Sequence, residues 1–173
     1  MRVTDDIVEK NVGINRVTTV VPGGRTFSFA ALTVAANPKK RTIGYGYGKA
    51  KEVADAMRKA SEQARKNMVY IPLTASGTIY HPIVFREGAT KIMLKPAAEG
   101  TGIIAGAGMR AVLEVLGVQN IVAKCLGSPS KIGVVRATIK ALTQIVTPNY
   151  AAEKRGKTVS EILGRVSKGG AHE

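Results

Sequence analysis

The segment Gly44–Lys49 constrains the fold more than any other part of the sequence, because glycine alternates there with larger residues. Successive side chains of a β-strand point to opposite faces. Ile43, Tyr45 and Tyr47 would therefore share one face, and the alternating glycines would leave the other face bare. A bare face allows either a helix or an RNA strand to approach the backbone closely. The segment thus predicts a closely packed strand and leaves both candidates open.

An alanine-rich helix is expected directly after this strand. Small and apolar residues recur at steps of three and four, the spacing of one helix face: Ala50, Val53, Ala54, Met57, Ala60 and Ala64. Charged residues fill most other positions, so we predict a helix from about Lys49 to Asn67. Because one face is so rich in alanine, the helix is expected to pack closely on the strands before it.

Two further strands precede the glycine segment. Extended sequence runs from Ile7 to Val21 and from Thr26 to Val34, and the third strand covers Thr42–Tyr47. Pro22–Arg25 supplies the first turn, since proline fixes one φ and the two glycines tolerate positive φ. Asn37–Arg41 supplies the second turn. Three strands joined by short turns predict an antiparallel meander.

Residues 71–147 are predicted to form a second unit. We expect strands at Thr78–Phe85, Lys91–Lys95 and Val118–Leu126, and helices at about Ile103–Leu116 and Lys131–Gln144. Gly117 is placed to end the first helix, because glycine adopts the left-handed conformation without steric cost. Pro148 is expected to end the regular pattern, which leaves residues 148–173 as a polar, basic tail. The prediction is an α+β chain with a sheet-and-helix domain at 7–70 and an α/β domain at 71–147.

The chain is strongly basic, with 26 Lys and Arg residues against 12 Asp and Glu and a formal net charge of +14. Its 45% of hydrophobic residues suffices for folded cores, so this is not a disordered basic chain. Between Gly88 and Ala152 only Glu99 and Glu114 are acidic. So much like charge on a compact fold favours a polyanionic partner. Nucleic acid is the common one, because Lys and Arg contacts release the counterions of its phosphates.

Neither glycine-rich segment matches an enzyme motif in full. A phosphate-binding loop needs a glycine where Ile43 stands and a Ser or Thr where Ala50 follows Lys49. The turn at 100–105 has the spacing of a dinucleotide fingerprint, but no carboxylate lies between Glu114 and Glu153 to bind a ribose. We predict no catalytic residue, no cofactor and no small-molecule substrate.

Metal binding and membrane insertion are not predicted either. His81, His172 and the single Cys125 lie far apart, without the spacing of metal ligands. Cys125 stands in an apolar run and is expected to be a small buried residue in a reducing compartment. No apolar run approaches the roughly 20 residues of a membrane helix, and the start of the chain lacks the apolar core of a signal peptide. We therefore expect a cytoplasmic protein without a membrane partner.

The candidate RNA-binding residues are mainly the basic side chains of turns and element ends. Arg25 stands beside two glycines whose backbone N–H groups can approach phosphate closely. Several basic loops coincide with glycine-rich turns in one small sheet-and-helix unit, the layout of a protein that reads the shape of folded RNA. The predicted RNA contacts are Arg16, Gly23, Gly24, Arg25, Lys39, Lys40, Arg41, Lys49, Lys51, Lys124 and Arg136.

Many segments share their order and spacing with a known family: Asn15–Val17, Gly23–Arg25, Phe27–Leu32, Gly44–Ala50, Lys66–Met68, Glu99–Gly106, Met109–Glu114, Val134–Thr138 and Lys154–Lys157. On these residues the chain resembles the family of bacterial small-subunit ribosomal protein five. The match extends over nearly the whole chain, which makes it more specific than any single motif above.

The resemblance implies a first domain like a double-stranded-RNA-binding domain and a second α/β domain with a left-handed βαβ crossover. It implies a structural part of the small ribosomal subunit that binds 16S ribosomal RNA, bridges body and head, and contributes to assembly and decoding accuracy. Small-subunit ribosomal proteins four and eight are the expected protein partners. By resemblance, Gly23, Gly24 and Arg25 lie in the RNA-binding hairpin loop, and Gly102 and Arg110 at the contact with protein four. In a helix that begins at Ile103, Arg110 would follow Gly102 by about two turns, on the same side.

Two segments depart from the family pattern. Ser130–Gly133 stands where the family often has asparagines, and Asn37–Arg41 is more basic than the corresponding turn. Two other functions stay open at this point. One is a free-standing regulator that binds double-stranded RNA, and the more distant one is an enzyme of nucleotide chemistry.

Overall fold

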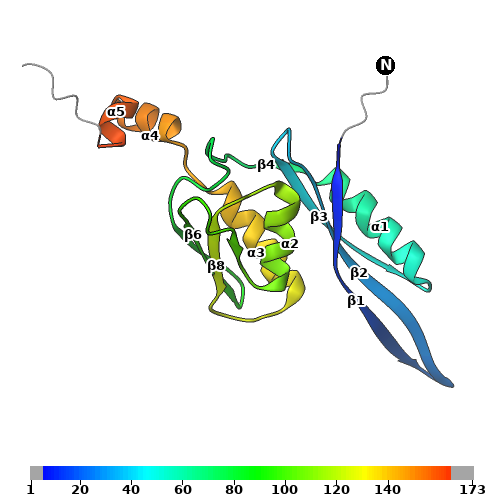
Figure 1. The fold of residues 1–173 in the computed structure, drawn as a ribbon. Helices are drawn as coiled ribbons and strands as arrows, with labels where there is room; N and C mark the ends of the chain where they lie inside the picture. Colours follow the sequence, from blue (N-terminus) through cyan, green and yellow to red (C-terminus); the bar gives the residue numbers. More distant parts are fainter. Residues whose placement is uncertain (1–5, 165–173) are drawn as a thin grey trace, which may run out of the picture.

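The chain folds into four layers in the computed structural model, which describes residues 6–164. Helix α1 lies on the outside, followed by a first sheet, then by α2 and α3, and then by a second sheet (Figure 1). We call the first the N-terminal sheet and the second the C-terminal sheet. The stacking buries the apolar faces of the inner helices against sheets on both sides.

The N-terminal sheet is the predicted meander with one short strand added. Its order is β1-β2-β3-β4 and every pair is antiparallel. The strands are β1 Val8–Val21, β2 Gly24–Asn37, β3 Thr42–Ala50 and β4 Val69–Tyr70, and α1 spans Val53–Lys66. The predicted order of strands and helix is confirmed, although β2 continues past Val34 and α1 begins later than Lys49.

The bare face of β3 is covered by α1. A Cβ atom at Gly46 would lie 2.0 Å from the carbonyl oxygen of Ala60, and one at Gly48 would lie 2.2 Å from that of Ala56. Across the sheet, β2 places another small residue, Ala31, opposite Gly48. A helix, not RNA, therefore takes up the space that the glycines leave.

The C-terminal sheet has the order β5-β6-β8-β7, with β5 Ile83–Glu87, β6 Thr90–Pro96, β7 Ile103–Ile104 and β8 Ile121–Cys125. The β7–β8 pair is parallel and encloses α2, Ala107–Leu116, so these elements form the βαβ unit that the resemblance implied. The left-handed sense of its crossover stays a prediction. Helices α3 Lys131–Thr143, α4 Pro148–Arg155 and α5 Val159–Ile162 follow.

One apolar core joins the two units. Leu32 and Val34 of β2 belong to the same buried cluster as Val112 of α2, while the alternate residues of β2 face α1. β2 is therefore buried on both faces. An ion pair between Lys10 of β1 and Glu114 of α2 adds to this contact. The relative position of the two units is fixed by shared packing as well as by the connection between them.

The helix predicted from Ile103 begins four residues further on. Ile103 and Ile104 pair with β8, and α2 starts only at Ala107. Gly106 and Gly108 are poor helix formers, whereas the two isoleucines suit a strand. The end of α2 was predicted correctly, since Gly117 has the left-handed φ of +82°.

Two other expectations in the second unit are wrong in part. The strand expected at Thr78–Phe85 covers only Ile83–Glu87. Residues 74–78 form a tight turn in which the Thr74 hydroxyl accepts from the Thr78 N–H at 3.0 Å, and Pro82 has no N–H for a ladder. The strand expected from Val118 begins at Ile121. Cys125, expected to be buried, is half-buried.

Pro148 begins a helix instead of ending the regular structure. The Thr147 hydroxyl accepts a hydrogen bond from the Tyr150 N–H at 3.3 Å and caps α4. Proline is favoured in the first turn because its missing N–H would have no partner there. The prediction of a tail is therefore wrong for α4 and α5, and residues 165–173 lie outside the described part of the chain.

Candidate nucleic-acid interface

β1 and β2 extend beyond the body as a two-stranded ribbon, residues 16–28, which we call the arm (Figure 1). β3 pairs with β2 only from Phe29 to Asn37, so the arm has no third strand. An isolated two-stranded ribbon is only marginally stable in water. Val20 near its tip is nevertheless 77% exposed. The arm is thus a surface suited to contact with another molecule.

The tip of the arm combines an open backbone with positive charge. Gly23 and Gly24 have φ values of +106° and +149°, and a Cβ at either would meet nothing within 4 Å. Arg25 is exposed and pairs in register with Val20. No residue between 16 and 28 is acidic. An exposed glycine turn beside an unopposed guanidinium is well suited to approach phosphate.

Arg16 also lies on the arm, and its position depends on an aromatic ring. Its guanidinium carbon lies 3.8 Å from the centroid of Phe27 on the neighbouring strand, a cation–π contact. Phe27 is 44% exposed, so the stacked pair forms part of the surface. Sequence reasoning missed Phe27. An aromatic residue two positions after Arg25, on the strand that leaves the turn, is the signal that could have identified it.

The second basic turn lies far from the tip. β2 has 14 residues, so at about 3.3 Å per residue its two ends are roughly 40 Å apart. Lys39 forms an ion pair with Asp6 there, and the hydrogen bond from Lys39 holds the pKa of Asp6 below its usual value. The two basic turns therefore lie at opposite ends of β2.

Two other residues of this turn stabilise the chain itself. Arg41 has a φ of +52°, and its guanidinium donates to the Leu73 carbonyl at 2.6 Å. The Lys40 backbone N–H donates to the Asn37 side chain at 3.0 Å. Arg41 thus links the turn to the segment that connects the two sheets. RNA contacts of Lys39, Lys40 and Arg41 stay predictions.

Lys49 and Lys51 lie at the base of the arm. Lys49 pairs in register with Ala30 near the end of β3, and Lys51 follows in the bend before α1. Both are exposed. No carboxylate in residues 6–164 forms an ion pair with Lys49, Lys51, Arg16 or Arg25. The structure therefore brings these four cations to one end of the N-terminal sheet.

Arg136 and Lys124 lie in different surroundings. Arg136 of α3 places its Nε 2.8 Å from Oε1 of Glu87, and Lys140 Nζ lies 2.6 Å from the same oxygen. The hydrogen bond from Lys140, with smaller contributions from the two positive charges, holds the pKa of Glu87 below its usual value. Lys124 is exposed on the C-terminal sheet and has no such partner in residues 6–164.

Gly102 and Arg110 are not related by one helix, because β7 lies between them. Arg110 therefore does not follow Gly102 by two turns of one helix, as expected from the sequence. Gly102 has a φ of +70°, and its N–H donates to the Asn120 side chain at 3.1 Å. Arg110 is exposed on α2, and its Nε donates to the Ala105 carbonyl at 3.4 Å.

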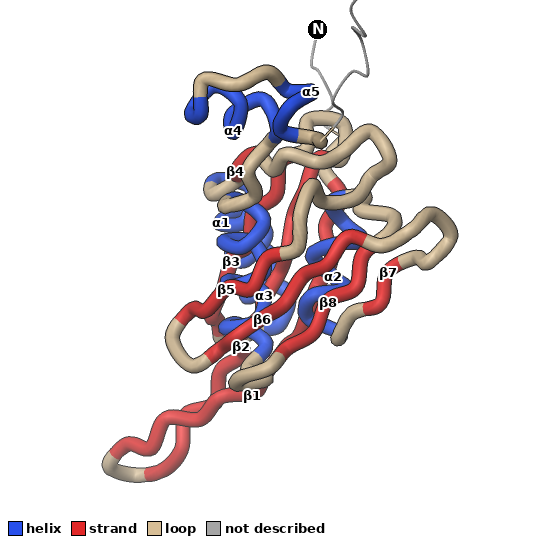
Figure 2. The backbone as a smooth tube through the Cα atoms, turned by 90° about the vertical axis from the view of Figure 1, so that its left-hand side faces the viewer, coloured by secondary structure: helices blue, strands red, loops and turns tan. Residues whose placement is uncertain are grey.

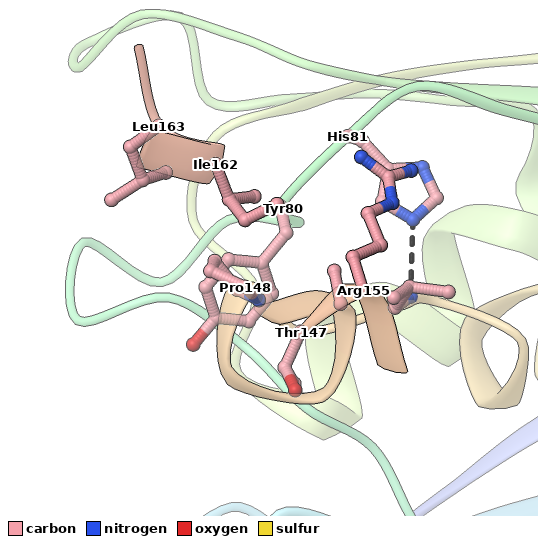
Figure 3. Close-up of a pocket in the computed structure, with 9 residues that line it drawn as sticks. Tyr80, His81, Thr147, Pro148, Arg155, Ile162 and Leu163 are labelled. Carbon is pink, nitrogen blue, oxygen red and sulfur yellow. Dashed lines mark hydrogen bonds between the residues drawn. The ribbon is translucent and has the colours of Figure 1, made fainter. Parts of the chain in front are cut away.

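Several cavities lie on the surface of the described structure. One of about 430 Å³ lies beside α4 and α5, lined by Tyr80, His81 and Arg155 among others (Figure 3). Its histidine is engaged, since Nε2 accepts a hydrogen bond from the Val146 N–H at 3.0 Å. Within residues 6–164 no three His, Cys, Asp or Glu side chains gather as a metal site. None of the helices described there is both long and apolar enough to cross a membrane.

Comparison with known proteins decides the family. The model of the ribosomal protein S5 N-terminal domain matches residues 7–72, and that of the S5 C-terminal domain matches residues 85–155. The chain belongs to the ribosomal protein S5 family. The arm, β3 and α1 lie in the part that matches the S5 N-terminal domain. Gly102 and Arg110 lie in the part that matches the S5 C-terminal domain.

Similar S5 proteins come from several bacteria. The small ribosomal subunit protein uS5 of Legionella pneumophila (strain Corby) is 57% identical over 160 residues, which is 92% of this chain and 94% of that protein. The uS5 protein of Nitrosococcus oceani is 54% identical over 160 residues, with 92% and 93% covered. That of Caulobacter vibrioides (strain NA1000 / CB15N) is 54% identical over 168 residues, with 97% and 83% covered.

Proposed function

We propose that this chain is a structural component of the small ribosomal subunit that binds 16S ribosomal RNA. Its relatives carry the name of a small-subunit protein, and the arm is the structural observation that supports the proposal. Residues 16–28 form an exposed ribbon with two arginines and no carboxylate. Lys49 and Lys51 extend the positive charge to its base. A ribbon that is marginally stable alone gains its order by lying against RNA.

In this role the protein works in assembly and in holding the head of the subunit relative to its body. A rigid body with a protruding arm suits such a bridge, because the shared core fixes the two units. We further propose that Gly102 and Arg110 face small-subunit protein four and that protein eight is a second neighbour. The exposed Arg110 side chain has no carboxylate partner in residues 6–164, so a partner protein can supply one.

Sedimentation tests the assignment as a whole. Tagged protein in a bacterial lysate should sediment with small subunits and should be released by ribonuclease treatment. A free-standing regulator of duplex RNA would instead remain outside the subunit fraction without ribonuclease. Sedimentation apart from subunits would overturn the proposal.

Charge reversal at Arg25 tests the arm. Arg25→Glu should weaken binding to 16S RNA. It should also reduce the magnitude of the negative slope of log K against log salt by roughly one unit or more, because at least one phosphate contact is lost. Arg58→Glu is the matched control, since Arg58 is exposed on α1 and already paired with Asp55 at 3.1 Å. Equal affinity and slope for the two variants would remove the arm from the RNA interface.

Charge reversal at Arg110 tests the contact with protein four. Arg110→Glu should weaken that contact and change the decoding error of reconstituted subunits, while binding to 16S RNA persists. Misreading and pull-down assays on the same subunits measure both effects. If both match wild type, Arg110 does not lie at this interface.

A further inference from the structure

The C-terminal sheet has one covered face and one open face. α2 and α3 lie behind it, and no element of residues 6–164 covers the front, which faces the viewer in Figure 2. Along β6 the covered side is marked by Ile92 and Leu94, both fully buried. Their neighbours along the strand, Lys91 and Lys95, are exposed on the other side. The front is therefore a solvent-facing surface of the described structure.

The open face consists of basic and apolar side chains. They alternate with the buried residues of each strand and are Val84, Arg86, Lys91, Met93, Lys95, Ile104, Val122 and Lys124. None is acidic. Val84 on the edge strand β5 is 57% exposed, and Ile104 on the opposite edge strand β7 is 53% exposed. The apolar residues thus lie between cations on one continuous surface.

The cations of this face are not neutralised within the described structure. Arg86 lies directly opposite Lys91 in the β5–β6 register, where like charges are destabilising. No carboxylate in residues 6–164 forms an ion pair with either residue, or with Lys95 or Lys124. The opposite holds behind the sheet, where Glu87 pairs with both Arg136 and Lys140. The open face therefore carries an electrostatic cost that a bound polyanion would remove.

We propose that the open face of the C-terminal sheet is a second RNA-binding surface and that it binds an RNA duplex. The inference rests on the proposed function and extends it from the arm to the other side of the molecule. Lys91 and Lys95 are separated by about 13 Å along the strand, a distance at which they contact different phosphates. Met93 lies between them, with Val84 beside it on β5, and these apolar side chains face the riboses of a wide, shallow minor groove. A single strand fits less well, because the face has no aromatic side chain for base stacking.

Neutralisation of the lysines tests this surface in the full chain. The triple variant Lys91→Gln, Lys95→Gln, Lys124→Gln should bind 16S RNA and a duplex RNA of about 20 base pairs more weakly. The magnitude of its negative slope of log K against log salt should decrease by roughly two to three units, one for each phosphate that is no longer neutralised. The control Lys59→Gln, Lys66→Gln, Lys154→Gln removes the same charge from exposed positions on α1 and α4 and should change the slope less. Equal slopes for the two triple variants would overturn the inference.

Two further measurements separate this inference from its alternatives. The midpoint of thermal unfolding of the triple variant should equal or exceed that of wild type, because Lys91→Gln removes one of two like charges that face each other across β5 and β6. Weaker RNA binding could then not be ascribed to misfolding. In purified subunits, Lys91, Lys95 and Lys124 should resist acetylation and become reactive after ribonuclease treatment. Protection that survives ribonuclease would mean that a protein covers the face and would overturn the RNA assignment. If Arg25→Glu weakens binding to 16S RNA while the Lys91, Lys95 and Lys124 triple variant does not, the proposed function stands and this inference alone fails.

Discussion

Glycines serve opposite purposes in two regions of the N-terminal sheet. On β3 the glycines leave room for a helix, since a Cβ at Gly46 would lie 2.0 Å from a carbonyl oxygen of α1. At the tip of the arm, Gly23 has empty space around it but a φ of +106° that other residues rarely adopt. The first region therefore determines the fold of the body. The second determines the shape of an exposed surface, so the two should respond differently to the same substitution.

The largest effect is expected on β3. Gly46→Ala should lower the free energy of unfolding by about 3 kcal/mol or more, at the upper end of overpacking effects. Backbone atoms on both sides have to move apart, because Ala60 O and Ala64 N lie 2.0 and 2.6 Å from the added carbon. Denaturant unfolding measures the change. A loss below about 1 kcal/mol would show that glycine does not set the distance between β3 and α1.

The pattern of glycines on β3 was readable from the sequence, but its partner was not. Alternation identifies a face without side chains, and either a helix or RNA can lie against such a face. The choice depends on where α1 packs, which is a tertiary property. The same limit explains why Leu32 and Val34 could be assigned to a strand but not to a core shared with α2.

The candidate interface was predictable in composition and less so in arrangement. Arg16 and Lys49 lie together at the base of the arm, because the register of β1, β2 and β3 aligns Arg16 with Ala50. Lys51 follows directly after β3, and Arg25 lies further out on the same arm. Lys39 and Arg41 looked similar in sequence but lie at the opposite end of β2. A sequence shows which residues are basic. The lengths of the strands decide which basic residues lie together, and ion pairs such as that of Arg136 with Glu87 decide which of them can still bind a partner.

A smaller effect is expected at the tip of the arm. Gly23→Ala should cost about 1 to 2 kcal/mol of stability through its positive φ, because no atom lies near enough to clash. Gly23→Asn is the matched control, since asparagine tolerates positive φ better than alanine. Its loss of stability should therefore be smaller. If Gly23→Asn destabilises more than Gly23→Ala, side-chain size and not φ governs the tip, and the contrast with Gly46 disappears.

The smallest effect is expected for the ring that supports Arg16. Phe27→Leu keeps an apolar side chain and the charge of the arm but removes the cation–π contact at 3.8 Å, worth about 0.5 to 1 kcal/mol at an exposed site. If Phe27 serves to position Arg16, affinity for 16S RNA should fall roughly two- to fivefold. The salt dependence should stay the same, because no charge is removed.

Arg16→Leu provides the comparison for that measurement. It removes the charge itself, so it should also reduce the magnitude of the salt slope by about one unit. Binding titrations at several salt concentrations distinguish the two variants. A shallower salt slope for Phe27→Leu would mean that the contact between Phe27 and Arg16 is needed to bring the Arg16 charge to a phosphate. An unchanged affinity would mean that Phe27 is a bystander on the arm. On the arm, a substitution such as Phe27→Leu should change RNA affinity with little effect on the free energy of unfolding, because Phe27 is exposed. On β3, a substitution such as Gly46→Ala should instead lower the free energy of unfolding, because α1 packs against that glycine.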